Sequence, residues 1–162
     1  MKPENLLEYN GTVKIADFGL TKVTKSKPPF TDYVSTRWYR APEIILRYLR
    51  PPHPRSTKYG PAIDIFACGA IMGELYRNFP LFPGTSELDQ MTKICKILGT
   101  PTKKDWPEGY SLARKMQYKF PKHRKTSVNE WKNKLCPTAN DDAIDLILQM
   151  LRYNPSKVLP YH

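Results

Sequence analysis

The sequence predicts a mainly α-helical domain that carries one small β-hairpin. Residues 62–76 are apolar on nearly every side, as expected of a central buried helix. Two further stretches, which begin near Ser86 and Asn140, place apolar residues at helical spacing. Near the start of the chain, Asn10-Gly11 separates two short β-like runs and signals a tight turn, because both residues tolerate a positive φ. We therefore expect an α+β fold in which helices dominate.

The composition is typical of a soluble globular domain of 162 residues with a net charge of +11. The basic residues are spread along the chain and not interleaved with aromatic residues, so we expect a solvated basic surface and no nucleic-acid partner. No signal peptide or membrane span is apparent, and we expect no membrane partner. The three cysteines are widely spaced, which favours a reducing, intracellular compartment.

The first half of the chain contains the predicted hairpin and two predicted loops. Its strands are expected at residues 6–8 and 13–16. Residues 20–37 show no amphipathic period, and residues 47–61 are rich in proline and arginine, so both stretches are predicted to be loops.

The second half contains the helices. The run 62–76 carries only Asp64 and Glu74 as charges and is too short for a membrane span. A capping box at Ser86–Asp89 starts the next helix, which ends at Gly99, and the last helix stops before Pro155. The stretch 100–138 between them is predicted to be rich in loops. The expected inward residues are Leu88, Met91, Ile94 and Leu98 of the first of these helices, Ile144, Ile147, Leu148 and Leu151 of the last, and the core cysteines Cys68 and Cys95.

Two polar side chains flank the predicted hairpin. Asn5 precedes it, and Asp17 follows it in the run Asp17-Phe18-Gly19. The two ends of a short hairpin lie close together, so an amide and a carboxylate oxygen can converge on divalent cations that neutralise phosphates. Either residue alone is more simply interpreted as a loop or turn cap. The pair at hairpin spacing favours the metal-binding interpretation.

Four motifs in order then indicate a family. They are K-P-E-N at 2–5, D-F-G at 17–19, A-P-E at 41–43 and D-x-F-x-x-G at 64–69. With these motifs the chain resembles the C-terminal lobe of a eukaryotic protein kinase. The run TDYVSTRWYRAPE looks like the CMGC group of mitogen-activated and cyclin-dependent kinases. The runs PLFPGTSELDQ and KILGTPTKKDWPEGY look like its male germ cell-associated kinase (RCK) branch.

The resemblance implies that 1–162 is a partial kinase domain that lacks the N-terminal lobe. Its parts would be the end of the catalytic loop, an activation segment at 17–43, a central helix at 62–78, a CMGC-type helix and insert region at 86–136, and a last helix at 140–153. The implied enzyme is an ATP-dependent protein serine/threonine kinase that uses Mg²⁺.

The resemblance also implies roles for individual residues. Asn5 and Asp17 would bind Mg²⁺, and Lys2 would reach the transferred phosphate. Thr31 and Tyr33 would be phosphorylated to order the activation segment. Arg37 and Arg40 would receive the phosphotyrosine and favour a proline-directed substrate pocket, and Thr36 would line that pocket. Asp64 would hold the backbone of the catalytic loop. Without the resemblance, Arg37, Arg40 and Asp64 are ordinary surface or helix-terminal charges.

The chain departs from the family pattern at both ends. Counting back from Asn5 puts the catalytic aspartate one place before Met1, and no Gly-rich loop or paired strand lysine is present. Val158 stands where the family has the arginine that pairs with Glu43, so we expect Glu43 to lack that partner. We therefore expect this chain alone to be inactive. A non-catalytic docking or scaffold module and an incomplete gene model are the alternatives.

The expected partners follow from the resemblance. They are protein substrates with Ser-Pro or Thr-Pro sites and an upstream activating kinase. The expected location is intracellular and cytoplasmic, and the resemblance also suggests the nucleus or the cilium.

Overall fold

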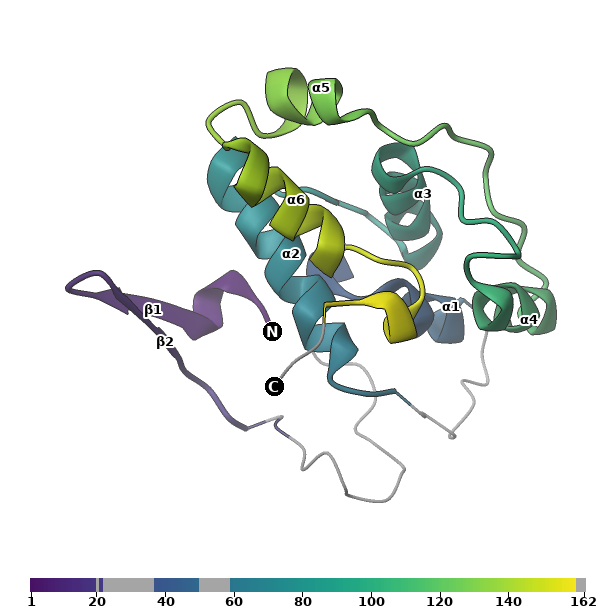
Figure 1. The fold of residues 1–162 in the computed structure, drawn as a ribbon. Helices are drawn as coiled ribbons and strands as arrows, with labels where there is room; N and C mark the ends of the chain where they lie inside the picture. The colour runs from purple at the N-terminus through teal and green to yellow at the C-terminus, as the bar shows by residue number, and fades with distance from the viewer. Residues whose placement is uncertain (20, 22–36, 50–58, 160–162) are drawn as a thin grey trace.

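The computed structural model describes residues 1–19, 21, 37–49 and 59–159. Helices form one body, and a two-stranded antiparallel sheet projects from it (Figure 1). This confirms the predicted mainly helical fold with a small hairpin. The strands are β1 (Leu6–Tyr9) and β2 (Thr12–Ile15), and the helices are α1 (Pro42–Tyr48), α2 (Ala62–Arg77), α3 (Glu87–Leu98), α4 (Pro107–Lys115), α5 (Val128–Glu130) and α6 (Asp141–Met150).

The hairpin turns at the predicted dipeptide. Asn10 and Gly11 have φ of 50° and 74°, the conformation that the turn between β1 and β2 requires. The register pairs Leu6 with Ile15, and each strand ends within one residue of its predicted bound. The hairpin extends away from α2 in Figure 1. Its open end, where the chain enters and leaves, therefore lies nearer the helical body than its tip.

The central helix is confirmed as the core element. α2 packs along α6, and both Phe66 of α2 and Ile147 of α6 are fully buried. The backbones approach closely at Gly69, where a Cβ atom would lie 2.9 Å from Cβ of Met150. Cys68, predicted to be in the core, is only half-buried.

The helix after Ser86 is confirmed, and one of its predicted inward residues is wrong. The Ser86 hydroxyl caps α3 by accepting from the Asp89 amide at 3.1 Å. The Asp89 carboxylate accepts from Thr85, so the reciprocal half of the capping box is missing. Leu88 is 56% exposed, because the first turn of α3 buries Gln90 against the preceding loop instead.

The stretch 100–138 is more ordered than predicted. It contains α4, α5 and a π-helical turn at Trp131–Leu135. The sequence did not predict α4, because Pro107 and Gly109 lie within it and both residue types usually interrupt helices. The glycine is required by packing, since a Cβ there would lie 2.0 Å from the Trp106 ring. Trp106 and Trp131 are both buried.

The loop predicted from residue 47 starts too early. Arg47 and Tyr48 belong to α1, which begins with Pro42 at its first position, where the missing N–H costs nothing. The described end of the chain holds a short 3₁₀ turn at Pro155–Lys157. Within the described ranges, none of the helices has both the length and the apolar character needed to span a bilayer.

Candidate functional site

The open end of the hairpin brings Asn5 and Asp17 together. A 3₁₀ turn at Pro3–Asn5 leads into β1, and its last residue is held to the other strand by a hydrogen bond. The Ala16 amide donates to the Asn5 carbonyl at 2.8 Å, which extends the ladder by one step beyond Leu6 and Ile15. Asp17 is the next residue along the chain. The backbone therefore places the amide and the carboxylate at one end of the sheet.

Asp17 adopts a conformation that directs the chain sharply away from β2. Its φ is 59°, which aspartate and asparagine tolerate better than most residues. The Gly19 amide donates to Asp17 Oδ1 at 3.2 Å. The carboxylate is exposed, and its second oxygen is available for another ligand.

An amide and a carboxylate oxygen are ligands of the kind that Mg²⁺ binds. Magnesium prefers oxygen ligands and binds through one or two protein groups together with substrate phosphates and water. Groups of three histidine, cysteine or acidic side chains that could form a complete metal cage are absent from the described residues. A two-ligand site that a nucleotide completes is consistent with both observations.

Lys2 directly precedes this turn, and Asp64 contacts Met1. The Asn5 amide donates to the Lys2 carbonyl at 3.1 Å, so the lysine begins the turn that Asn5 ends. The Met1 ammonium group contacts Asp64 Oδ1 at 3.1 Å. Asp64 is in the first turn of α2. The proposed roles of Lys2 and Asp64 remain predictions.

Residues 37–40 are anchored to two helices. The first three of them, Arg37–Tyr39, form a short 3₁₀ turn before α1. The buried Tyr39 hydroxyl donates to Glu74 of α2 at 2.8 Å, and burial together with this carboxylate raises the pKa of the tyrosine. The Trp38 indole donates to the Gly84 carbonyl at 3.0 Å, just before α3. The segment that the resemblance assigns to the substrate pocket is thus fixed to both α2 and α3.

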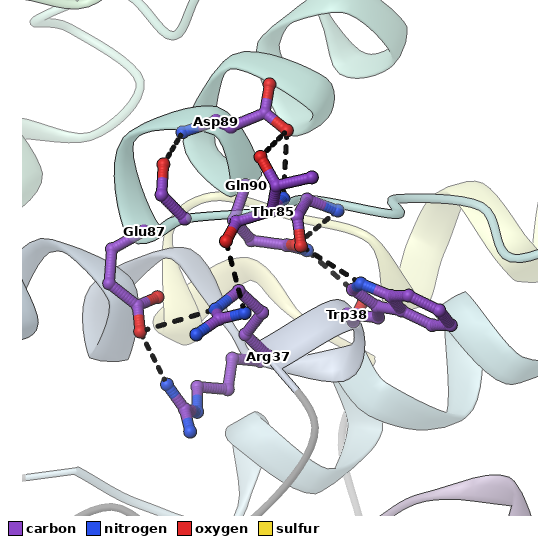
Figure 2. Close-up of polar contacts among 9 residues, drawn as sticks. Arg37, Trp38, Thr85, Glu87, Asp89 and Gln90 are labelled. Carbon is purple, nitrogen blue, oxygen red and sulfur yellow. Dashed lines mark hydrogen bonds and ion pairs between the residues drawn. The ribbon is translucent and has the colours of Figure 1, made fainter.

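The two arginines of this segment meet on one carboxylate (Figure 2). Arg40 Nη1 lies 3.1 Å from Glu87 Oε1, and Arg37 Nε lies 3.6 Å from the same oxygen. Arg37 also donates to the Thr85 carbonyl at 3.4 Å. The structure therefore brings together the two arginines that the sequence identified, and adds Glu87, which the sequence did not.

Gln90 is the second residue that sequence reasoning missed. It is fully buried, and its side chain accepts from the Gly84 amide at 3.0 Å and donates to the Trp38 carbonyl at 3.3 Å. Helical spacing gave no sign of this, because a glutamine in the first turn of a helix usually faces solvent. The available signal was the SELDQ run itself, which the resemblance had marked as family-specific without giving its residues a role.

Glu43 is a buried carboxyl group at the start of α1. It is 9% exposed, and burial raises its pKa to about 7, although its backbone hydrogen bond and Arg47 act in the opposite direction. Val158, which stands at the place of the family arginine, is also buried. The charged form of Glu43 is therefore poorly stabilised.

Glu43→Gln is expected to stabilise the chain at pH 8. The folded-state pKa lies above the ordinary 4.5, so ionisation costs more in the folded state, and the stability of the wild type falls as pH rises from about 4.5 to about 7. Removing the ionisation should recover up to about 3 kcal/mol above that range. The measurement is urea unfolding at pH 4.5 and pH 8 of the wild type and the variant. An unchanged pH dependence in Glu43→Gln would contradict the assignment.

Three predicted site residues lie outside the described residues. They are the proposed phosphorylation sites Thr31 and Tyr33, and Thr36 of the proposed substrate pocket. Their roles stay predictions.

Comparison with known proteins gives one consistent result. The family model described as protein kinase domain matches residues 1–160. The serine/threonine-protein kinase MAK of Homo sapiens is 52% identical over 158 residues, which cover 97% of this chain and 23% of the relative. Cyclin-dependent kinase F-3 of Oryza sativa subsp. japonica is 51% identical over 157 residues, which cover 97% of this chain and 34% of the relative. The serine/threonine-protein kinase ICK of Mus musculus is 49% identical over 158 residues, which cover 97% of this chain and 23% of the relative.

The chain therefore belongs to the protein kinase domain family. Its relatives MAK, ICK and the cyclin-dependent kinases place it with the CMGC serine/threonine kinases, as the motifs predicted. It spans about a quarter to a third of the length of these relatives. Kinases of this family use ATP and Mg²⁺ to phosphorylate proteins.

Proposed function

We propose that the chain is part of a serine/threonine kinase that transfers the γ-phosphate of ATP to Ser or Thr preceding proline. The observation that carries this proposal is the hydrogen bond that continues the β-ladder at the open end of the hairpin. The Ala16–Asn5 hydrogen bond of 2.8 Å brings the backbone at Asn5 close to Asp17, which supports a two-ligand site for a divalent cation. Mg²⁺, when bound, would neutralise the phosphates during transfer.

The segment 37–40 supports a regulated, proline-directed substrate pocket. Arg37 and Arg40 converge on one point, where a phosphate on Tyr33 could be received in place of or beside the Glu87 carboxylate. We propose that phosphorylation of Thr31 and Tyr33 by an upstream kinase orders the activation segment through such contacts between phosphate and arginine. The described cysteines are free thiols, which supports an intracellular location for the enzyme.

A docking or scaffold role is the second candidate. The observation that favours it is the firm attachment of residues 37–40 to α2 and α3 by contacts that need no nucleotide. A partner could bind this surface without any phosphate transfer. Co-purification of a protein that depends on residues 86–136 would support this role, and retention of that partner after deletion of these residues would exclude it.

We expect the 162-residue polypeptide, purified alone, to transfer no phosphate from ATP to a Ser-Pro peptide. The sequence contains no aspartate at the general-base position of the kinase loop and no Gly-rich loop over the phosphates. The measurement is incorporation of labelled phosphate with MgATP. A mock purification is the negative control, and incorporation above it that Asn5→Ala abolishes would overturn this expectation.

A further inference from the structure

A cleft lies where the end of α3 meets the turn that follows α6. It has a volume of about 380 Å³ and opens to solvent. Three separate parts of the chain line it: Leu98 with the loop that follows α3, Lys125, and the stretch from Leu148 of α6 to Lys157. The candidate metal site and residues 37–40 do not contribute to it, so the cleft is a feature distinct from both.

The walls of the cleft are joined at Gly99. The Tyr153 hydroxyl donates to the Gly99 carbonyl at 2.7 Å, which ties the turn after α6 to the end of α3. A Cβ atom on Gly99 would lie 2.8 Å from Lys125 Cα, so these two backbones are in close contact. The Thr126 amide donates to the Ile97 carbonyl at 3.2 Å and holds this contact in place. The Lys125 side chain therefore starts from a fixed backbone position.

The loop 99–105 is also joined directly to the turn 154–157. The Asn154 side-chain amide donates to the Asp105 carbonyl at 3.2 Å. The oxygen of the same side chain accepts from the Ser156 amide at 3.1 Å, which caps the short 3₁₀ turn. Hydrogen bonds within the chain thus define the shape of the cleft, and no ligand is needed to form it.

The cleft is rich in positive charge. Lys125, Arg152 and Lys157 line it, and all three are exposed. Within the described part of the chain, none of the three forms an ion pair. Asp105 is the one acidic side chain in the described lining, and its carboxylate accepts from the Thr102 hydroxyl at 2.5 Å. Three positive charges and one negative charge leave +2, so the cleft attracts anions.

Leucine side chains form the apolar part of the lining. Leu98 and Leu151 are buried, and Leu148 is half-buried. An apolar side chain that entered the cleft would leave water against these leucines, which is favourable in proportion to the area that it buries. The ligand that matches both parts of the lining carries one apolar group between negative charges.

We propose that this cleft binds an extended acidic segment of a partner protein. An apolar side chain of that segment packs on the leucines, and the flanking carboxylates bind Lys125, Arg152 and Lys157 through charge-assisted hydrogen bonds. A single-stranded nucleic acid would gain from stacking on exposed aromatic rings. The aromatic residue of the described lining, Tyr153, is half-buried with its hydroxyl bonded to Gly99, which favours the peptide. Such a site recruits a protein independently of phosphate transfer.

The test is fluorescence anisotropy of the full 162-residue chain with the labelled peptide GSEELEESG, in which one leucine lies between paired glutamates. This peptide should bind, and its affinity should fall with added salt because the cations of the cleft are exposed. Two matched peptides separate the contributions. GSQQLQQSG lacks the charges and GSEEGEESG lacks the apolar side chain, and each should bind about fivefold more weakly.

Variants of the chain locate the binding. Arg152→Gln and Lys157→Gln should each weaken the binding of GSEELEESG about threefold, and the double variant about tenfold. Arg114→Gln and Lys119→Gln remove the same charges at exposed positions that do not line the cleft, and should leave the affinity at the wild-type value. Circular dichroism checks that each variant is folded. The two cleft variants are independent, so either one alone tests the proposal.

Four results would overturn the proposal. The first is no binding of GSEELEESG at millimolar concentration. The second is equal weakening by the cleft variants and the control variants, which would show that the peptide binds the basic surface as a whole. The third is equal affinity for GSEEGEESG and GSEELEESG. The fourth is tighter binding of an oligothymidylate that the cleft variants weaken, which would assign the cleft to nucleic acid instead.

Discussion

Asp17→Asn is expected to lower kcat on the order of 1,000-fold in a chimera in which residues 1–160 replace the matching stretch of human MAK. The substitution removes the charge that faces the cation while keeping the side-chain shape. Asparagine adopts the positive φ of 59° as readily as aspartate, and its oxygen can still accept from Gly19. The backbone should therefore be unaffected, and the loss should be in the chemical step. The measurement is phosphorylation of a Ser-Pro peptide at saturating MgATP.

A matched control separates the loss of the cation ligand from a general loss of charge. Asp142→Asn makes the same change at an exposed position in the first turn of α6. It should leave kcat within about twofold, since surface substitutions away from the site usually have small effects. Equal activity of the Asp17 and Asp142 variants would show that Asp17 does not bind the catalytic cation.

Gly84→Ala is expected to destabilise the chain by about 3 kcal/mol. A Cβ at this position would lie 2.5 Å from Gln90 Cα and 2.7 Å from Gln90 N, which are backbone atoms of α3 that cannot move aside separately. The loop before α3, which contains Gly84, would have to move away from that helix. That movement would break the hydrogen bonds from Trp38 to Gly84 and from Gly84 to Gln90, which fix residues 37–40. Urea unfolding measures the loss.

Gly60→Ala provides the comparison for this prediction. Gly60 lies just before α2 with nothing within 4 Å of the place that a Cβ would occupy. The free energy of unfolding of this variant should stay within about 0.5 kcal/mol of the wild type. If Gly84→Ala were as stable as Gly60→Ala, the close contact between the loop and α3 would not exist in solution.

The sequence predicted those features that short-range patterns determine. Asn10-Gly11 located the hairpin turn because few other dipeptides accept two positive φ values. The hairpin in turn predicted that Asn5 and Asp17 lie at the same end of the sheet, as the ladder from Ala16 to Asn5 bears out for the backbone, while metal binding there stays a prediction. Apolar residues on nearly every side located α2, and apolar periodicity located α3 and α6, since each of the latter two must bury one face.

The features that the sequence did not predict depend on long-range contacts. Glu87 is 47 residues from Arg40, and no local pattern distinguishes it from an ordinary acidic residue in the first turn of a helix. Gln90 was likewise invisible, because its partners lie in the loop before α3 and in the segment 37–40. α4 was missed because of misleading local signals, not because of distant contacts. Its local signals favoured a loop, and the packing of Gly109 against Trp106 overrides them.

Phosphate transfer by the unmutated MAK chimera tests the central claim most directly. The claim is that these residues form the metal-binding and substrate-binding part of a proline-directed kinase. The chimera should phosphorylate a Ser-Pro peptide in the presence of MgATP and discriminate at least tenfold against the matched Ser-Ala peptide. A folded, ATP-binding chimera that phosphorylates neither peptide, or both equally well, would contradict the account.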